Sequence, residues 1–404
     1  MNDASRKSNE DPKRRGWFGR AFVALAPSAT RADLGRIAAI WLATTAVLAC
    51  FAYGVTAVFP ESDAQMWHVT KRKLLDVWVR WDSARYLDIA QRGYRIYEDG
   101  ADNTRSFPLY PCLIAALMPF HRYQQAMAQG ISLAAFFLLL CVLFDVAAKR
   151  HGKAVAHRAV FYMCIFPSAL YFRAVYAESL FTLLVLLSYR AFVNDRYARC
   201  AVYGALAAMA RPPGIMLLPA FGVTLLWEIV RGQKRFSPAM CWIATITVGL
   251  AAVMLLQWQA TGDALTFVHS AARAESPRSL SWPGASIVAD ATHMATTWDF
   301  RTGRIAVNLL FDDIAAVLAI VLAIPLFRRY GCLAGCLPVS LILPPLMSGQ
   351  TVGMIRYILP AFYYVIFLAE VGERRFWFHT LWVYASSLLL AFYTICFACW
   401  YWTA

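Results

Sequence analysis

Long apolar segments alternate with short basic clusters along nearly the whole chain, and no other feature constrains the fold as strongly. Arg and Lys concentrate at 147–158, 189–199, 230–235, 327–331 and 372–376. Several segments between them approach or reach the roughly 20 apolar residues that a helix needs to cross a bilayer. Hydrophobic residues make up 60% of the 404 positions and charged residues only 15%, which is more apolar than a soluble globular chain. The sequence therefore predicts an all-α polytopic membrane protein, embedded in a lipid bilayer.

The formal net charge of +14 is divided among these clusters. A chain that binds nucleic acid usually gathers its basic residues on one face, so we expect no nucleic-acid partner and interpret the clusters as topology signals. The 10 cysteines lie mostly inside apolar segments, where cysteine acts as a small hydrophobe. Neither a disulfide framework nor a zinc site is indicated. No cofactor is predicted, and a divalent metal held by carboxylates from separate loops stays an open alternative.

The N-terminal 35 residues are polar and basic and precede a long apolar run. That run exceeds the apolar region of a cleaved signal peptide, so we expect an uncleaved signal anchor with a cytoplasmic N-terminus. We predict a disordered basic tail over 1–35 and a single transmembrane domain over 36–404. The positive-inside rule then gives about 11 crossings with the C-terminus outside. The predicted crossings are 36–59, 126–148, 155–172, 177–194, 200–211, 214–231, 238–258, 306–326, 331–347, 355–371 and 378–400.

Two large loops, 60–125 and 259–305, fall on the outer face in this topology. The arrangement requires that the apolar stretch 107–120 does not cross the membrane. Three prolines interrupt that stretch, and a helix of its length would span only about 21 Å against a hydrocarbon core of about 30 Å. The predicted crossing at 200–211 is similarly short.

The first outer loop contains a polar segment, WDSARYLDIAQRG at 81–93. Its pattern predicts an amphipathic helix at the membrane surface, ended by Gly93. Asp82, Arg85 and Tyr86 share one face of that helix because they lie three and four positions apart. Asp82 is either the N-cap of the helix or a general base that accepts a proton from an attacking hydroxyl. Asp88 with Arg92, four positions on, is typical of a solvated ion pair.

Five motifs along the chain carry a family resemblance. They are RWDSARYLDIAQRGY (80–94), FPLYP (107–111), FPSALYFRAVYAESLF (166–181), ARPPGI (210–215) and RYILPAF (356–362). In order and rough spacing, over about 80 to 365, they resemble the successive motifs of the PIG-V mannosyltransferase family, including its bacterial members. The resemblance implies a GT-C-type bundle, a polyprenyl-phosphate sugar donor and a reaction on the outer or lumenal face. It also implies that Asp82 matches the acidic residue regarded as catalytic in this class.

Two arginines at the outer ends of predicted crossings are candidates for binding the donor phosphate. Arg211 precedes two prolines, and Arg356 follows a glycine-rich turn. A charge there needs a partner or must snorkel to the surface, and a lipid phosphate is an appropriate partner. Tyr357 is placed to stack on a prenyl chain or sugar. The alternative for both arginines is a simple anchor at a helix end.

Further substrate-binding candidates lie in the same outer region. Trp81, Arg85 and Tyr86 flank Asp82 in the first loop. Glu178 either accepts hydrogen bonds from sugar hydroxyls or pairs with Arg173. Asp263, next to Gly262, is either a turn residue or a substrate contact.

Together these expectations describe a glycosyltransferase of the bacterial inner membrane with its active site toward the periplasm. It transfers a hexose, which the family resemblance implies is mannose, to a hydroxyl of a glycolipid, glycan or protein with inversion. A membrane transporter or lipid flippase is the alternative, but that class is typified by inverted repeats or ionisable residues deep within the spans. A purely structural scaffold leaves the ordered motifs without an explanation.

Overall fold

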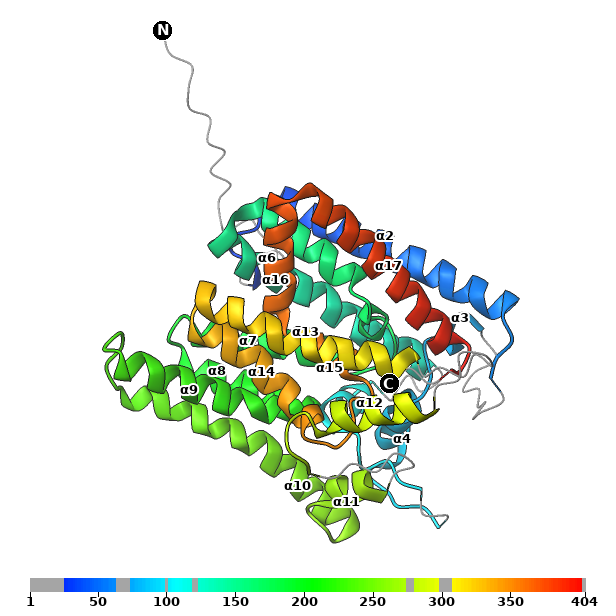
Figure 1. The fold of residues 1–404 in the computed structure, drawn as a ribbon. Coiled ribbons are helices and arrows are strands. Elements are labelled where there is room, and N and C mark those ends of the chain that lie inside the picture. Colours follow the sequence, from blue (N-terminus) through cyan, green and yellow to red (C-terminus); the bar gives the residue numbers. More distant parts are fainter. Residues whose placement is uncertain are drawn as a thin grey trace, which may run out of the picture.

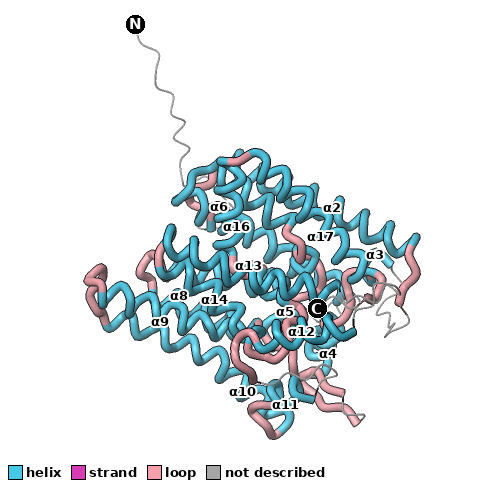
Figure 2. Tube along the Cα trace, in the orientation of Figure 1, coloured by secondary structure: helices cyan, strands magenta, loops and turns pink. Residues whose placement is uncertain are grey.

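The computed structural model describes residues 25–62, 73–98, 101–117, 123–273, 280–297 and 307–401. Figure 2 shows that helices make up nearly all of this part, with loops gathered at the ends of the bundle. Within it there is no regular strand, and Ile96 and Asp102 form an isolated antiparallel bridge. The prediction of an all-α fold is confirmed.

The order of the helices along the chain is as follows. The N-terminal part contains α2 (Arg31–Val58), α3 (Lys73–Asp76), α4 (Ser83–Arg92), α5 (Leu109–Ala115), α6 (Gln124–Ile165), η3 (Ala169–Phe172), α7 (Glu178–Phe192) and α8 (Tyr197–Ala210). The middle contains η4 (Pro212–Met216), α9 (Leu217–Val230), η5 (Pro238–Ile246), α10 (Thr247–Thr261), α11 (Thr266–Arg273) and α12 (Ala285–Thr297). The C-terminal part contains α13 (Val307–Tyr330), α14 (Cys332–Leu346), α15 (Met354–Ile358), α16 (Phe362–Arg374) and α17 (Phe376–Ala398).

Six helical stretches in the described part are long and apolar enough to cross a membrane. They are Arg31–Val58, Gln124–Ile165, Pro212–Val230, Pro238–Thr261, Leu309–Tyr330 and Phe376–Ala398. Several other predicted crossings coincide with helices of 13 to 15 residues, namely α7, α8, α14 and α16. A helix of 15 residues spans only about 22 Å. The count of about 11 crossings is therefore not confirmed.

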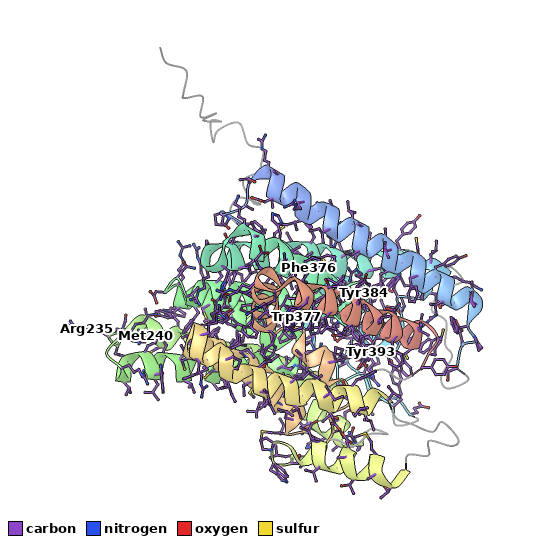
Figure 3. The ribbon with its side chains drawn as sticks, turned by 45° about the horizontal axis from the view of Figure 1, so that its top comes forward. Arg235, Met240, Phe376, Trp377, Tyr384 and Tyr393 are labelled. Carbon is purple, nitrogen blue, oxygen red and sulfur yellow. The ribbon has the colours of Figure 1, made fainter. Side chains whose placement is uncertain are left out.

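The short helix α7 shows why length alone misjudges such segments. Nearly all of its side chains are buried, and it packs against both α6 and α8. A helix enclosed by other helices does not have to match the thickness of the bilayer. In contrast, Phe376, Trp377 and Tyr384 on α17 are mostly exposed and lie along its outer side (Figure 3). The apolar outer helices are thus the ones suited to contact lipid.

Several predicted boundaries shift for local reasons. Helix α2 begins at Arg31, inside the predicted tail 1–35, because Thr30 and Asp33 form a capping box. Gly152 has a φ of 81° and divides α6 into two arms, which match the predicted crossings 126–148 and the first part of 155–172. The second arm ends at Ile165, before a Phe-Pro pair that disfavours helix. Residues 1–24 of the predicted tail lie outside the described residues.

The predicted outer region gathers at one end of the bundle. Helices α4, α11 and α12 lie together there in Figure 1, while the turn between α9 and α10 lies at the opposite end. The stretch 107–120 forms only α5, a helix of 7 residues in its described part. This is too short to cross a membrane, as the prolines predicted. The candidate site lies at the end marked by α4.

Candidate active site

A cavity of about 620 Å³ opens where four of the five motifs meet. Helix α4, the loop before α5, the turn after α8 and helix α15 all contribute to its wall. The first predicted outer loop and the Pro-Pro turn of ARPPGI thus line the same cavity although they are far apart in the sequence. The charged and polar lining residues are Asp82, Arg85, Tyr86, Arg105, Ser106, Arg211, Ser348, Arg356 and Tyr357. The apolar part of the wall includes Phe107, Met216, Phe267, Leu343 and Pro344.

Asp82 precedes α4 and has one quarter of its side chain exposed to the cavity. Its side chain makes no N-cap hydrogen bond. The carboxylate instead accepts hydrogen bonds from Arg85, at 2.7 Å, and from Arg356, at 3.1 Å. The helix over 83–92 and its end at Gly93 are as predicted, and Asp82 does stand at the N-cap position, but its side chain does not cap the helix. The reason is that two guanidinium groups compete for the carboxylate more effectively than the backbone does.

The electrostatic surroundings keep Asp82 ionised. Burial opposes its ionisation, but the positive charges of Arg356, Arg85, Arg105 and Arg211 outweigh that effect and hold the pKa of the carboxyl below its usual range. The carboxylate is therefore available as a proton acceptor at neutral pH. The same arginines also restrain its basicity, so a group that draws the arginines away would make Asp82 a stronger base.

Arg356 contacts both carboxylates of the site, those of Asp82 and Glu178. Its guanidinium lies 3.1 Å from the Asp82 carboxylate and 3.0 Å from that of Glu178. It also lies over the rings of Tyr171 and Tyr176, at 5.4 and 5.5 Å. The aromatic rings and the carboxylates fix the guanidinium plane at the cavity wall.

Asp312 positions the backbone that carries Arg356. The turn before α15 passes through Gly353, whose φ of 81° is in the left-handed region. Glycine adopts this conformation at little cost because it has no Cβ. The two oxygens of Asp312 accept hydrogen bonds from the backbone N–H groups of Gly353 and Ile355, at 2.9 and 3.0 Å. Asp312 is almost fully buried. Its role is to hold the start of α15, and with it Arg356, in place.

Arg211 completes the cationic wall. It donates a hydrogen bond to the buried carboxylate of Glu178 and lies 5.0 Å over the ring of Tyr357. The turn that follows is tight, because a Cβ on Gly214 would collide with the backbone of Ala207. Arg211 is almost entirely buried, so it is not the snorkelling side chain of the alternative interpretation.

Glu178 pairs with these two arginines and not with Arg173. The predicted Arg173 alternative is wrong, because that guanidinium turns toward α2 and donates to the hydroxyls of Thr44 and Thr45. Glu178 is 1% exposed and begins α7, where the helix dipole favours a carboxylate. Its Oε2 atom has no hydrogen-bond partner among the described residues. Glu178 does not line the cavity itself but neutralises part of the charge of the arginines that do.

The remaining candidates divide between the cavity and its surroundings. Tyr86 lines the cavity and packs edge-on against Tyr110 of FPLYP, with ring centroids 5.3 Å apart. Trp81 does not line it; it adopts a positive φ of 53° and packs against Trp400, at 5.5 Å. Asp263 does not line the cavity either. Its carboxylate accepts a hydrogen bond from the N–H of Leu265, as the turn interpretation predicts.

Asp88 has a larger structural role than a solvated pair. It lies 3.6 Å from Arg92, as predicted, but it also accepts hydrogen bonds from Tyr97 and from the side-chain amide of Asn103. These contacts tie the segment after α4 back onto the helix. Asp88 therefore stabilises the loop that leads to FPLYP.

Two site residues escaped the sequence analysis. Arg105 lines the cavity and stands two positions before FPLYP, so its place beside a motif was a usable signal. Asp312 gave a signal as a carboxylate within an apolar segment, a position that is usually functional. The sequence does not indicate which residues Arg105 and Asp312 contact.

The balance of charge makes the cavity suited to an anion. Four arginines line it, at 85, 105, 211 and 356, whereas Asp82 and the adjoining Glu178 carry two negative charges. Among the described residues this leaves a net charge of two positives. A phosphodiester carries one negative charge and a phosphomonoester up to two at neutral pH. Either group matches the excess.

We expect Arg85→Gln to shift the acid limb of the activity profile to higher pH. The positive charge of Arg85 helps hold the pKa of Asp82 below its usual range, and the base must be ionised to act. Removing that charge raises the pKa, so the active form is lost earlier as the pH falls. A pH profile of kcat/KM measures the shift. Arg92→Gln, on the same helix but outside the cavity, is the control, and an unmoved acid limb in Arg85→Gln would contradict this account of Asp82.

We expect Asp312→Asn to weaken donor binding more than it slows turnover. The amide keeps one acceptor and turns an N–H pair toward the backbone donors that the carboxylate had satisfied. Arg356 then loses its fixed position, so KM for the donor rises about tenfold or more while kcat changes less. Steady-state kinetics measures both. A fall in kcat at unchanged KM would argue against a positioning role.

The fold and the site define a helical membrane protein whose loops at one end of the bundle build a cation-lined cavity around a carboxylate. Residues 41–255 match the sequence model of the family described as Mannosyltransferase (PIG-V). This match covers more than half of the chain, and the chain therefore belongs to the PIG-V mannosyltransferase family, as its motifs predicted.

Individual relatives are more distant. GPI mannosyltransferase 2 of Schizosaccharomyces pombe is 27% identical over 171 residues, which cover 41% of this chain and 35% of the yeast protein. The structure of the Archaeoglobus fulgidus oligosaccharyltransferase with a tethered acceptor peptide gives a TM-score of 0.45 at 10% identity. The match covers 90% of this chain and 55% of the oligosaccharyltransferase chain. The same enzyme, named AglB, in complex with an inhibitory peptide and a dolichol-phosphate, gives 0.45 at 12% identity, with 89% and 55% covered.

Proposed function

We propose that the protein is a membrane glycosyltransferase that moves a hexose, mannose by family membership, from a polyprenyl-phosphate donor to an acceptor hydroxyl. The observation that carries the proposal is the cavity in which a carboxylate and an excess of arginine charge face one another. A family of mannosyltransferases supplies the reaction class. We further propose that the chain resides in a bacterial inner membrane with this cavity toward the periplasm, in agreement with the positive-inside reading of its basic clusters.

The mechanism needs three elements of the site. The donor phosphate is held by Arg211 and Arg356, which can each donate two parallel hydrogen bonds to phosphate oxygens. Tyr357 lies beside both arginines and can pack against the prenyl chain or the sugar. Asp82 removes the proton from the acceptor hydroxyl as its oxygen attacks the anomeric carbon.

The electron count of this step is simple. The acceptor oxygen forms the new glycosidic bond while the bond from the anomeric carbon to the phosphate oxygen breaks. The phosphate leaves with the bonding electrons and gains one negative charge, which the arginine excess stabilises. The proton passes to Asp82. A single displacement of this kind inverts the configuration at the anomeric carbon.

Donor binding also prepares the base. A phosphate that engages Arg356 competes directly with the Asp82 carboxylate for the same guanidinium. As that interaction weakens, the pKa of Asp82 rises toward its usual range and the carboxylate becomes a better proton acceptor. Base activation is thereby linked to occupation of the donor site.

The test is a donor-turnover assay. Purified protein in lipid is incubated with polyprenyl-phosphate mannose, glucose and other hexose donors and with a membrane extract as the acceptor source. Release of polyprenyl phosphate from one donor, dependent on the extract, supports the proposal. A parallel series with a chelator decides whether a divalent metal takes part. If no donor is consumed with any extract, the transferase proposal fails and the transporter alternative gains support.

A further inference from the structure

A second cavity, of about 510 Å³, lies among helix ends far from the candidate active site. The ends of α7 and α9 and the junction of α13 with α14 form its wall. The turn between α9 and α10 lies at the opposite end of the bundle from α4 in Figure 1, and Figure 3 places Arg235 at that tip. The charged residues that line the cavity are Arg150, Glu228, Arg231, Lys234 and Arg328.

The arginines of this cavity are not neutralised in the way that the active-site arginines are. Lys234 lies 2.6 Å from Asp195 and 3.4 Å from Glu228. In contrast, Arg150, Arg231 and Arg328 form no ion pair with any residue in the described part of the chain. Arg231 is held instead over the ring of Trp227, at 4.2 Å. The lining therefore has a clear excess of positive charge, fixed in part by aromatic packing.

The start of α14 adds to the attraction for an anion. Gly331, with a φ of 95°, precedes the helix, and Gly331, Cys332 and Leu333 all line the cavity. The first N–H groups of a helix of this length have no partner within the helix and carry the positive end of its dipole. No side chain caps them. Backbone donors and guanidinium groups thus face the same space.

An apolar groove continues from this cavity along the outside of the bundle. The groove, of about 390 Å³, runs between α9, α13 and α14 and shares Phe327 and Arg328 with the basic cavity. Its other walls include Val223 and Ile324, which are about half exposed. Gly335 allows α13 and α14 to pack closely beneath the groove, because a Cβ at this position would come within 2.7 Å of the Cβ of Phe327. A cationic head site thereby adjoins a shallow apolar channel.

We propose that this pair of features binds an anionic phospholipid of the surrounding bilayer. The phosphate lies among Arg231, Arg328 and the N-terminus of α14, and one acyl chain lies in the groove between α9, α13 and α14. A soluble anion would leave the apolar groove unoccupied, and a purely apolar molecule would leave the arginines without an anionic partner. Basic pockets between helices at the basic face of a membrane protein suit anionic lipid headgroups. The site is separate from the cavity proposed for the sugar donor.

Native mass spectrometry of the full chain released from detergent tests this proposal. The protein is titrated with phosphatidylglycerol, with phosphatidylcholine of the same chains, and with polyprenyl phosphate. We expect retention of phosphatidylglycerol in preference to phosphatidylcholine, and Arg231→Gln combined with Arg328→Gln should weaken that retention about tenfold or more. Val223→Trp, which fills the groove from its exposed side, should also weaken it. Arg235→Gln, on the same turn but outside the cavity, should leave it unchanged.

Three outcomes would overturn the proposal. They are equal retention of both phospholipids, full retention of phosphatidylglycerol by the double variant, and preferential binding of polyprenyl phosphate that the double variant abolishes. Thermal unfolding of each variant in detergent without added lipid shows whether it is folded. Arg231 and Arg328 are both exposed, so their replacement by Gln should leave that transition unchanged.

Discussion

Asp82→Asn lowers the rate of sugar transfer by about 10²- to 10⁴-fold in our account, because that is the usual contribution of one positioned general base. Asn retains the size of the side chain but cannot accept the proton. The donor still binds, since Arg211 and Arg356 remain. Single-turnover measurements with a radiolabelled donor separate the two effects: transfer slows while the donor Kd stays within a fewfold of its value in the unaltered protein.

The matched control for this substitution is Asp263→Asn. Asp263 lies in the second predicted outer loop and does not line the cavity; its carboxylate accepts the N–H of Leu265. Its replacement should leave transfer nearly unchanged. If Asp82→Asn transfers sugar as fast as the unaltered protein, Asp82 is not the base, and the second carboxylate of the site, Glu178, becomes the residue to examine.

Arg356→Lys is expected to raise the KM for the donor by about ten- to a hundredfold, a loss of roughly 1.4 to 3 kcal/mol in binding. Lysine keeps the charge but loses the planar fork that meets two oxygens at once. It also no longer joins Asp82 to Glu178. Initial rates over a range of donor concentrations measure KM and kcat separately.

Folding has to be separated from function at this position. Removing one partner of a buried ion pair leaves the other uncompensated and can cost about 3–5 kcal/mol of stability. The lysine variant avoids most of that cost, and the double variant Arg356→Met with Glu178→Gln removes both charges together. Arg92→Lys, an exposed arginine on α4, is the control. An unchanged donor KM in the folded lysine variant would argue that the donor phosphate binds elsewhere.

Local features of the fold were predictable from the sequence. The polar helix at 83–92 and its glycine stop follow from periodicity and from the free φ of Gly93. The prolines of 107–120 correctly predicted a short helix. Four of the five basic clusters lie at the ends of helices and the fifth, 147–158, lies at the Gly152 kink of α6, because lysine and arginine are costly within the apolar core. Each of these signals is contained within a few turns of chain.

The partners within the site were not predictable. Arg356 lies 274 positions from Asp82, and only the tertiary packing of α15, against α13 and α14, places it at the site. Sequence proximity suggested Arg173 as the partner of Glu178, but the packing of α2 drew that arginine away. The crossing count stays unconfirmed for a related reason, because the burial of a short helix such as α7 by its neighbours is not visible in a single segment.

The most direct test of the central claim is a structure of the protein with a polyprenyl-phosphonate sugar, a donor analogue whose anomeric carbon cannot be released. We predict that the phosphonate lies between Arg211 and Arg356, that Arg356 has moved away from Asp82, and that the Asp82 carboxylate faces the anomeric carbon across a space that admits an acceptor hydroxyl. A phosphonate bound away from these arginines, or a sugar out of reach of Asp82, would contradict the account.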